Sequence, residues 1–199
     1  VTASARNQAQ LNNFVASGSY SLAVKGDNGV AANVTFSVSA AGATADGLAE
    51  AVKAFNDVSS QTGITAKLNG GSNGIILVNE SGANIQIQNN SVAGNTVSVG
   101  AYNSSTGVFA AGVAAAPAGG FATATGYVEM SSDKGFAIAN AVTPTLVTAG
   151  SSTLNAVNTI DVSTVDGSTK ALKIIDSALA SVNSQRASFG ALQSRFETT

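Results

Sequence analysis

Hydrophobic residues recur with a period of two in two stretches of the first quarter of the chain. This alternation is clearest at 20–24 and 34–38, where each apolar residue is followed by a polar or small one. A period of two predicts half-buried β-strands. Shorter apolar runs at 64–68, 75–79 and 85–88 lie between sequences rich in Gly, Asn and Ser. Such sequences form turns, so these runs predict three more strands.

The period changes to three and four residues between 45 and 60. Apolar residues recur with this spacing from Leu48 to Phe55. Such spacing places them on one face of an amphipathic helix, and Gly63 suits the end of that helix. The order of two strands, one helix and three strands predicts a β-rich module at 18–90 in which a short helix covers the sheet.

A second β-rich part is predicted at 91–155. Its apolar runs predict strands at 97–101 and 127–130, and the turn sequence SSDKG predicts that 136–139 pairs with the latter as a hairpin. The Ala- and Gly-rich stretch between these strands predicts either a surface loop or a poorly ordered segment. Residues 3–16 at the start of the chain are predicted as a second short helix.

The C-terminal residues 167–197 predict one long amphipathic helix. Positions alternately three and four residues apart form a single seam, and most of them are apolar. This heptad spacing is typical of helices that pack side by side. The seam residues are Leu172, Ile175, Leu179, Val182, Arg186, Phe189, Gln193 and Phe196.

Two residues of this helix have more than one interpretation. Arg186 either pairs with a group on a neighbouring helix or subunit, or extends along the edge of the seam to water. Gly190 costs about 1 kcal/mol relative to Ala inside a helix. It is explained either by close approach of a neighbouring backbone, which we favour, or by tolerated drift.

A long helix with an apolar stripe needs partners that bury the stripe. The other strongly predicted helix is half as long and covers its own sheet. We therefore expect the seam to pack against helices outside this chain, from missing flanks of a longer parent or from other subunits. The first residue, Val1, is not a natural start and favours missing flanks.

Composition excludes several function classes. Only 10% of the 199 residues are charged and the net charge is −2 at pH 7, so the chain has no electrostatic basis for binding nucleic acid or an anionic membrane. There is no Cys and no His, which removes thiolate and imidazole ligands and the commonest general base. We expect no enzymatic activity, no catalytic residue, no metal ligand and no cofactor. No stretch is apolar over the roughly 20 residues that a membrane-spanning helix needs.

The run from Ala171 to Glu197, ALKIIDSALASVNSQRASFGALQSRFE, resembles the C-terminal helical segment of bacterial flagellins. It carries the NSQR, GA and Q-x-RF elements of that segment. It departs from the family at Phe189, where Leu is usual, and at Ser194, where Asn is usual. Residues 19–90 resemble an insertion module of the variable part of flagellins, through the sequences ATADGLAEAVKAFN and GITAKLNG.

The resemblance implies an α+β fold. Residues 1–155 would form the variable, β-rich outer domain. Residues 156–199 would form the C-terminal segment of the filament-core domain, whose long helix belongs to a helical-bundle or coiled-coil core. The N-terminal core helices and the assembly-driving termini of a flagellin would then be missing from this chain.

The resemblance also implies a function. Flagellins are structural subunits that polymerise into the extracellular filament of the bacterial flagellum, which serves motility. The expected partners are other flagellin subunits and the N-terminal core helices of the parent. A Toll-like receptor that detects flagellins would make only a weak contact with this chain, through the C-terminal helix. The main segment that this receptor contacts lies in the N-terminal helices of a flagellin, which this chain would lack.

Two alternatives stay open. One is a hook–filament junction protein, which has a related helical end. The other is an extracellular adhesin or polysaccharide-binding module. The polar aromatic residues that could stack on sugars are Tyr20, Tyr102 and Tyr127, and the sequence shows no cluster of them.

Overall fold

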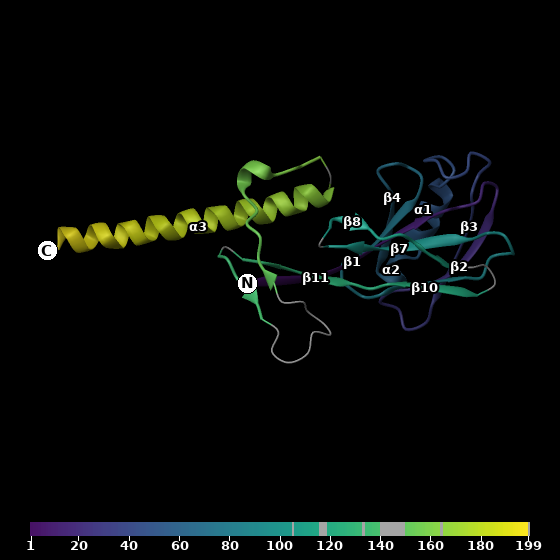
Figure 1. Cartoon of the computed structure of the whole chain (residues 1–199), viewed down its shortest axis with the longest axis horizontal. Helices are drawn as coiled ribbons and strands as arrows, with labels where there is room; N and C mark the ends of the chain where they lie inside the picture. Colours follow the sequence, from purple (N-terminus) through teal and green to yellow (C-terminus); the bar gives the residue numbers. More distant parts are fainter. Residues whose placement is uncertain (105, 116–118, 133, 140–149, 164, 199) are drawn as a thin grey trace. The chain divides into compact units, whose positions relative to one another are not determined.

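The fold is α+β, as predicted: many short strands, two short α-helices and one long C-terminal helix (Figure 1). The computed structural model describes residues 1–104, 106–115, 119–132, 134–139, 150–163 and 165–198. Contacts divide the chain into two compact units. Residues Ala3–Glu129 form one, which we call the β unit. Val1–Thr2 and Met130–Thr199 form the other, which we call the helical unit.

Two antiparallel sheets build the β unit. In the described residues the larger sheet has the order β4 (Ile64–Leu68), β5 (Ile75–Asn79), β1 (Thr2–Asn12), β7 (Val97–Asn103) and β8 (Val108–Phe109). Two further strands join it, since β9 (Val113–Ala115) pairs with β7 and β11 (Tyr127–Ser131) pairs with β1. The smaller sheet has the order β10 (Gly120–Ala124), β6 (Ile85–Asn89), β2 (Ser19–Lys25) and β3 (Ala32–Ser37).

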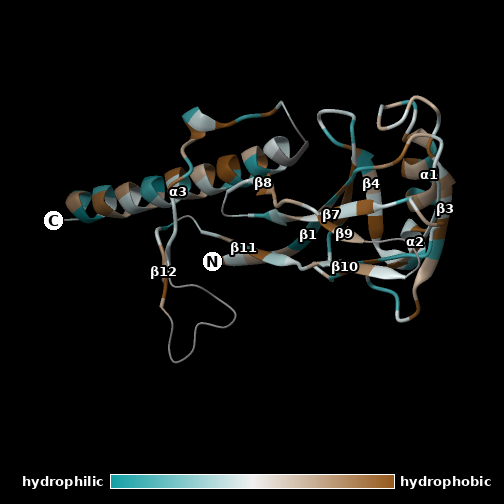
Figure 2. Cartoon of the chain, turned by 45° about the vertical axis from the view of Figure 1, so that its right-hand side comes forward, coloured by the Kyte–Doolittle hydropathy of each residue, from teal (hydrophilic) through white to brown (hydrophobic). Residues whose placement is uncertain are grey.

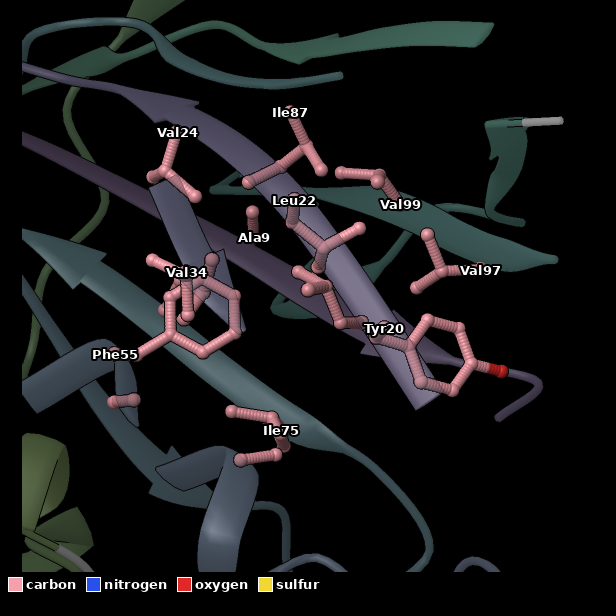
Figure 3. Close-up of a cluster of buried hydrophobic side chains, with 14 of the residues drawn as sticks. Ala9, Tyr20, Leu22, Val24, Val34, Phe55, Ile75, Ile87, Val97 and Val99 are labelled. Atoms are coloured by element: carbon pink, nitrogen blue, oxygen red, sulfur yellow. The ribbon is translucent and has the colours of Figure 1, made fainter. Parts of the chain in front are cut away.

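A single apolar core draws side chains from both sheets (Figure 3). Leu22 and Val24 of β2 contribute from the smaller sheet, and Leu11 of β1 and Leu77 of β5 contribute from the larger. Alternate residues of β2 and β3 are buried, and those between them are exposed or half-buried. The predicted period of two is therefore the pattern that buries one face of each strand.

A short helix, α1 (Ala49–Asp57), lies between the free edges of the two sheets and contacts both β3 and β4. Its apolar face buries Ala51 and Phe55 in the core. One turn further, α2 (Ser59–Thr62) ends at Gly63, whose φ of 69° is left-handed and confirms its predicted role as the helix terminator.

Polar side chains of α1 bond to the backbone of both edge strands. The Glu50 carboxylate accepts a hydrogen bond from the Ser37 amide of β3 at 3.1 Å. The Asn56 side chain accepts from the Ala66 amide of β4 at 2.7 Å and donates to the Ala66 carbonyl at 3.0 Å. These contacts supply partners that a neighbouring strand would otherwise provide.

Buried asparagines fasten the loops of the β unit. The Asn89 amide is fully buried, donates to the carbonyls of Asn95 and Ala115, and accepts from the Ser91 amide. Asn7 is also buried and donates to the carbonyls of Ala83 and Ala124. Each side chain thereby gives hydrogen-bond partners to backbone groups from segments that lie apart in the sequence.

In the helical unit, β12 (Ala137–Ile138) pairs with β13 (Gly150–Ser151). A 3-10 turn, η1 (Val157–Thr159), precedes α3 (Val165–Glu197) and contacts it. The long helix predicted at 167–197 is therefore present. None of the helices among the described residues is both long and apolar enough to cross a membrane.

The structure corrects the prediction of a helix at 3–16. This segment forms β1, which pairs with β5 on one side and with β7 on the other. Ala9 and Leu11 point into the core at a period of two, while Gln10 stays half-buried. The many Ala and Gln residues favour a helix locally, but burial between two strands outweighs that preference.

Two predictions for the second β-rich part were also wrong. The stretch predicted as an Ala- and Gly-rich loop contains β9 and β10, and residues 116–118 between them lie outside the described residues. The predicted hairpin partner of 127–130 pairs elsewhere, because β12 pairs with β13 while β11 pairs with β1. Ala side chains suffice in β10 because Ala122 and Ala124 face a core filled by larger neighbours.

Candidate assembly surface on the C-terminal helix

The apolar seam of α3 is exposed along its whole length. Leu179 is 57% exposed, and Figure 2 shows apolar residues recurring along the helix. Large apolar side chains are rarely gathered on an open surface unless the surface binds a partner. The apolar seam residues that lie exposed are Leu172, Ile175, Leu179, Val182, Phe189 and Phe196.

The polar members of the seam are exposed as well. Arg186 has no ion pair or side-chain hydrogen bond with any described residue, so it is available to a group outside them. Gln193 donates from Nε2 to the Glu197 carboxylate at 3.1 Å, one turn further along the helix. At Gly190 no described atom beyond its chain neighbours and the adjacent backbone of α3 lies within 4 Å of the position that a Cβ would take. The close approach expected at Gly190 therefore stays a prediction.

A second apolar stripe lies beside the seam, and the sequence analysis missed it. Ala171 is buried, and Ile174 and Ala178 are half-buried. These residues share the spacing of three and four with the seam, displaced by one position, so the same periodicity could have revealed them. The apolar face of α3 is therefore wider at its N-terminal end than one coiled-coil seam.

The chemistry of this surface is that of packing. No group of three or more acidic, His or Cys side chains that could hold a metal ion occurs among the residues that the structure describes. The exposed side chains are mainly aliphatic and aromatic, and such groups gain free energy when a partner removes them from water. The surface is therefore suited to binding another helix.

Two of the three tyrosines lie together in the structure, although the sequence shows no cluster of them. Tyr20 lies in the core, stacked on Phe36 with ring centroids 5.2 Å apart. Tyr102 instead contacts both Phe109 and Tyr127, with centroids 5.2 and 5.5 Å apart. These three rings, which we call the aromatic cluster, are half-buried. The sequence could not show this cluster because its members come from three separate strands, β7, β8 and β11.

Comparison with known proteins finds similarity to flagellins. No family model matches the chain. The chain is 32% identical to B-type flagellin of Pseudomonas aeruginosa over an alignment of 155 residues. That alignment covers 73% of this chain and 31% of that protein. It is 62% identical to polar flagellin A of Vibrio parahaemolyticus over 40 residues, which are 20% of this chain and 11% of that protein.

The chain thus spans less than a third of the length of these curated relatives. Flagellins are structural proteins, which agrees with the expectation that the chain is not an enzyme. The longer match extends well beyond the 27 residues of the C-terminal run on which the resemblance was first based. The resemblance of this chain to bacterial flagellins, indicated by residues Ala171–Glu197, is therefore confirmed over most of its length.

Proposed function

We propose that this chain is part of a structural subunit that polymerises into the extracellular filament of the bacterial flagellum. The observation that carries the proposal is the exposed apolar face of α3, in a chain whose relatives are flagellins. A filament built from one kind of subunit needs a surface that identical copies can bury repeatedly. An amphipathic helix 33 residues long provides such a surface.

The partners of α3 in this proposal are other helices of the filament core. They come from neighbouring subunits or from parts of the parent flagellin outside residues 1–199. Heptad spacing favours helical partners because each apolar side chain inserts between four residues of a facing helix. Arg186 supplies a charge at the middle of the seam, where it would fix the register of the packed helices.

The β unit would face the surrounding medium as the variable outer domain. Its core is complete without α3, since the buried apolar cluster is drawn from its strands and α1. A domain with its own core tolerates sequence change on its surface without loss of the filament core. In this proposal the β unit would be the outer part of a flagellin subunit, and α3 would belong to its core part.

Immunogold electron microscopy of the source cells tests the proposal. We expect an antibody raised against residues 1–155 to label long extracellular filaments along their length. Label at one spot where filament meets hook would instead support the junction protein. Label over the cell body with bare filaments would refute the filament role and favour a surface adhesin.

A pair of substitutions in full-length flagellin tests the role of the seam. Leu179→Asn places an amide on the seam, and we expect it to prevent or weaken filament assembly. Ser188→Asn places the same side chain on an exposed position of α3 off the seam and should leave assembly unchanged. Equal assembly of the two variants would show that the seam is not the packing surface.

Polysaccharide binding is a second candidate, which the aromatic cluster favours. Tyr and Phe rings can stack on the apolar faces of sugars, and Gln8 donates a hydrogen bond to the Tyr127 hydroxyl at 3.4 Å. A glycan array probed with the chain and with Tyr102→Ala tests this idea. Binding that Tyr102→Ala abolishes would support it, and a uniform lack of binding would remove it.

A further inference from the structure

We propose that Asn69 is a site of spontaneous deamidation, and that the fold protects the other Asn–Gly pairs of the chain from the same reaction. Asn followed by Gly is the pair most prone to this chemistry, because a glycine offers little steric hindrance to its own backbone nitrogen. The sequence has three such pairs: Asn28–Gly29, Asn69–Gly70 and Asn73–Gly74. Their surroundings differ in the structure.

The reaction needs only water. The Gly70 nitrogen loses its proton to a base in solution and attacks Cγ of Asn69, forming a tetrahedral intermediate. Nδ2 takes up a proton from water, the Cγ–Nδ2 bond breaks, ammonia leaves, and a five-membered succinimide remains. Water opens this ring at either carbonyl to give aspartate or isoaspartate. One water is consumed and one ammonia released, with no oxidation or reduction.

The hairpin between β4 and β5 favours this reaction at Asn69. Gly70 is exposed, and apart from its two chain neighbours nothing lies within 4 Å of the position that a Cβ would take there, so no other part of the fold crowds its backbone. The Asn73 amide donates to Oδ1 of Asn69 at 3.0 Å. That oxygen gains negative charge in the tetrahedral intermediate, and a donor already in place stabilises it.

Asn28 is held more firmly. Its Oδ1 accepts from the Gly26 amide at 2.7 Å, and its Nδ2 donates to the carbonyls of Val24 and Val30. Ring closure must pull the amide nitrogen away from two backbone acceptors. Asn69 has one acceptor to leave, the Oδ1 of the exposed Asn73 side chain at 2.7 Å.

Asn73 is protected by its neighbour. Gly74 is buried, and a Cβ on it would lie 2.6 Å from the Leu11 carbonyl of β1. The Gly74 nitrogen therefore cannot swing toward the Asn73 side chain without moving the backbone away from β1. The nucleophile is fixed at Asn73, and at Asn28 three hydrogen bonds to backbone groups hold the amide. At Asn69 the nucleophile is uncrowded, and the amide nitrogen is held only by an exposed side chain.

Deamidation would change the hairpin tip. The aspartate at 69 can no longer donate to Oδ1 of Asn73, so two acceptor oxygens face each other where one hydrogen bond was. Isoaspartate also inserts an extra methylene into the backbone next to β4. Each event adds one negative charge, and it cannot be reversed without new synthesis or repair.

Peptide mapping of the whole chain tests the proposal. The folded chain is aged in mildly alkaline buffer beside a sample kept in denaturant, which gives the intrinsic rate at each Asn. Combined cleavage after Lys and Glu separates the peptide 68–80 from the peptide 26–50, and fragmentation distinguishes Asn69 from Asn73. In denaturant we expect all three to react. In the folded chain Asn69 should react faster than Asn28 and Asn73 by about tenfold or more, the rate ratio for one lost hydrogen bond.

A matched pair of variants identifies the reacting nitrogen. Gly70→Ala and Gly29→Ala both add a methyl group in open space, so both should fold. We expect Gly70→Ala to slow the reaction of Asn69 and Gly29→Ala to leave it unchanged. The proposal is overturned if Asn28 or Asn73 reacts as fast as Asn69 in the folded chain, if Asn69 stays intact, or if Gly70→Ala has no effect.

Discussion

Two leucines provide a direct test of which apolar side chains are buried within residues 1–199 and which need a partner. Leu22 of β2 is 0% exposed, whereas Leu179 of α3 is 57% exposed. Leu22→Ala leaves a cavity in a closed core and should cost about 2–5 kcal/mol of unfolding free energy. In residues 1–199, Leu179→Ala should cost less than about 1 kcal/mol, because most of that side chain is already in water and Ala favours the helix.

The two substitutions can be followed separately in one molecule. The chain has three Tyr and no Trp, and all three Tyr lie in the β unit, so tyrosine fluorescence reports unfolding of that unit. Circular dichroism of the helical signal is dominated by α3, the longest described helix. Urea titrations read with both probes give the cost of each substitution.

The filament supplies the second half of the test. In filaments of full-length flagellin that carries this segment, Leu179 should be buried and Leu179→Ala should cost about 2–5 kcal/mol, as at a core site. The measured quantity is the depolymerisation temperature of the filaments relative to the unaltered protein. An equal cost of Leu179→Ala in filaments and in residues 1–199 would refute the proposal that assembly buries the seam.

Three further predictions concern other sites. Asn89→Ala should lower the free energy of unfolding by about 3 kcal/mol or more, because three buried backbone groups each lose a partner at roughly 1 kcal/mol or more. Asn90→Ala, at the exposed neighbouring position, should be nearly neutral in the same urea titration. Burial raises the pKa of the Tyr20 hydroxyl above its ordinary value. The stability that the neutral hydroxyl contributes is therefore fully present below the pKa of Tyr20 in the unfolded chain, and it is lost as pH rises through the pKa in the folded chain. Tyr20→Phe should reduce the fall in melting temperature in strong alkali, and an unchanged alkaline profile would contradict this. Residues 1–199 should activate the flagellin-detecting Toll-like receptor weakly or not at all in a reporter-cell assay, and a full response would contradict the weak contact expected of α3 alone.

The strands with clean alternation could be predicted from the sequence. In β2 and β3 the residue type decides which face is buried, so the period of two was sufficient. The long helix was predictable for the same reason, because its apolar residues repeat at three and four. The segment that became β1 was not, since its Ala and Gln residues carry little apolar contrast and its partners, β5 and β7, lie far along the chain.

The candidate assembly surface was predictable in position but not in extent. The heptad spacing indicated the seam, while the buried Ala171 and half-buried Ile174 belong to a neighbouring stripe of smaller side chains. The aromatic cluster could not be foreseen at all. Tyr102 and Phe109 are opposite each other in the β7–β8 pair, and Tyr127 joins them because β11 and β7 both pair with β1.

The position of α1 matters when many copies of the β unit lie close together. An open strand edge can recruit the edge of an identical molecule, and a filament would hold many identical domains within reach of one another. Glu50 and Asn56 occupy backbone groups on β3 and β4 that such a neighbour would use. A single nine-residue helix thereby makes one edge of each sheet a poor template for an identical copy. In the proposed filament, neighbouring outer domains would not join through these two edges.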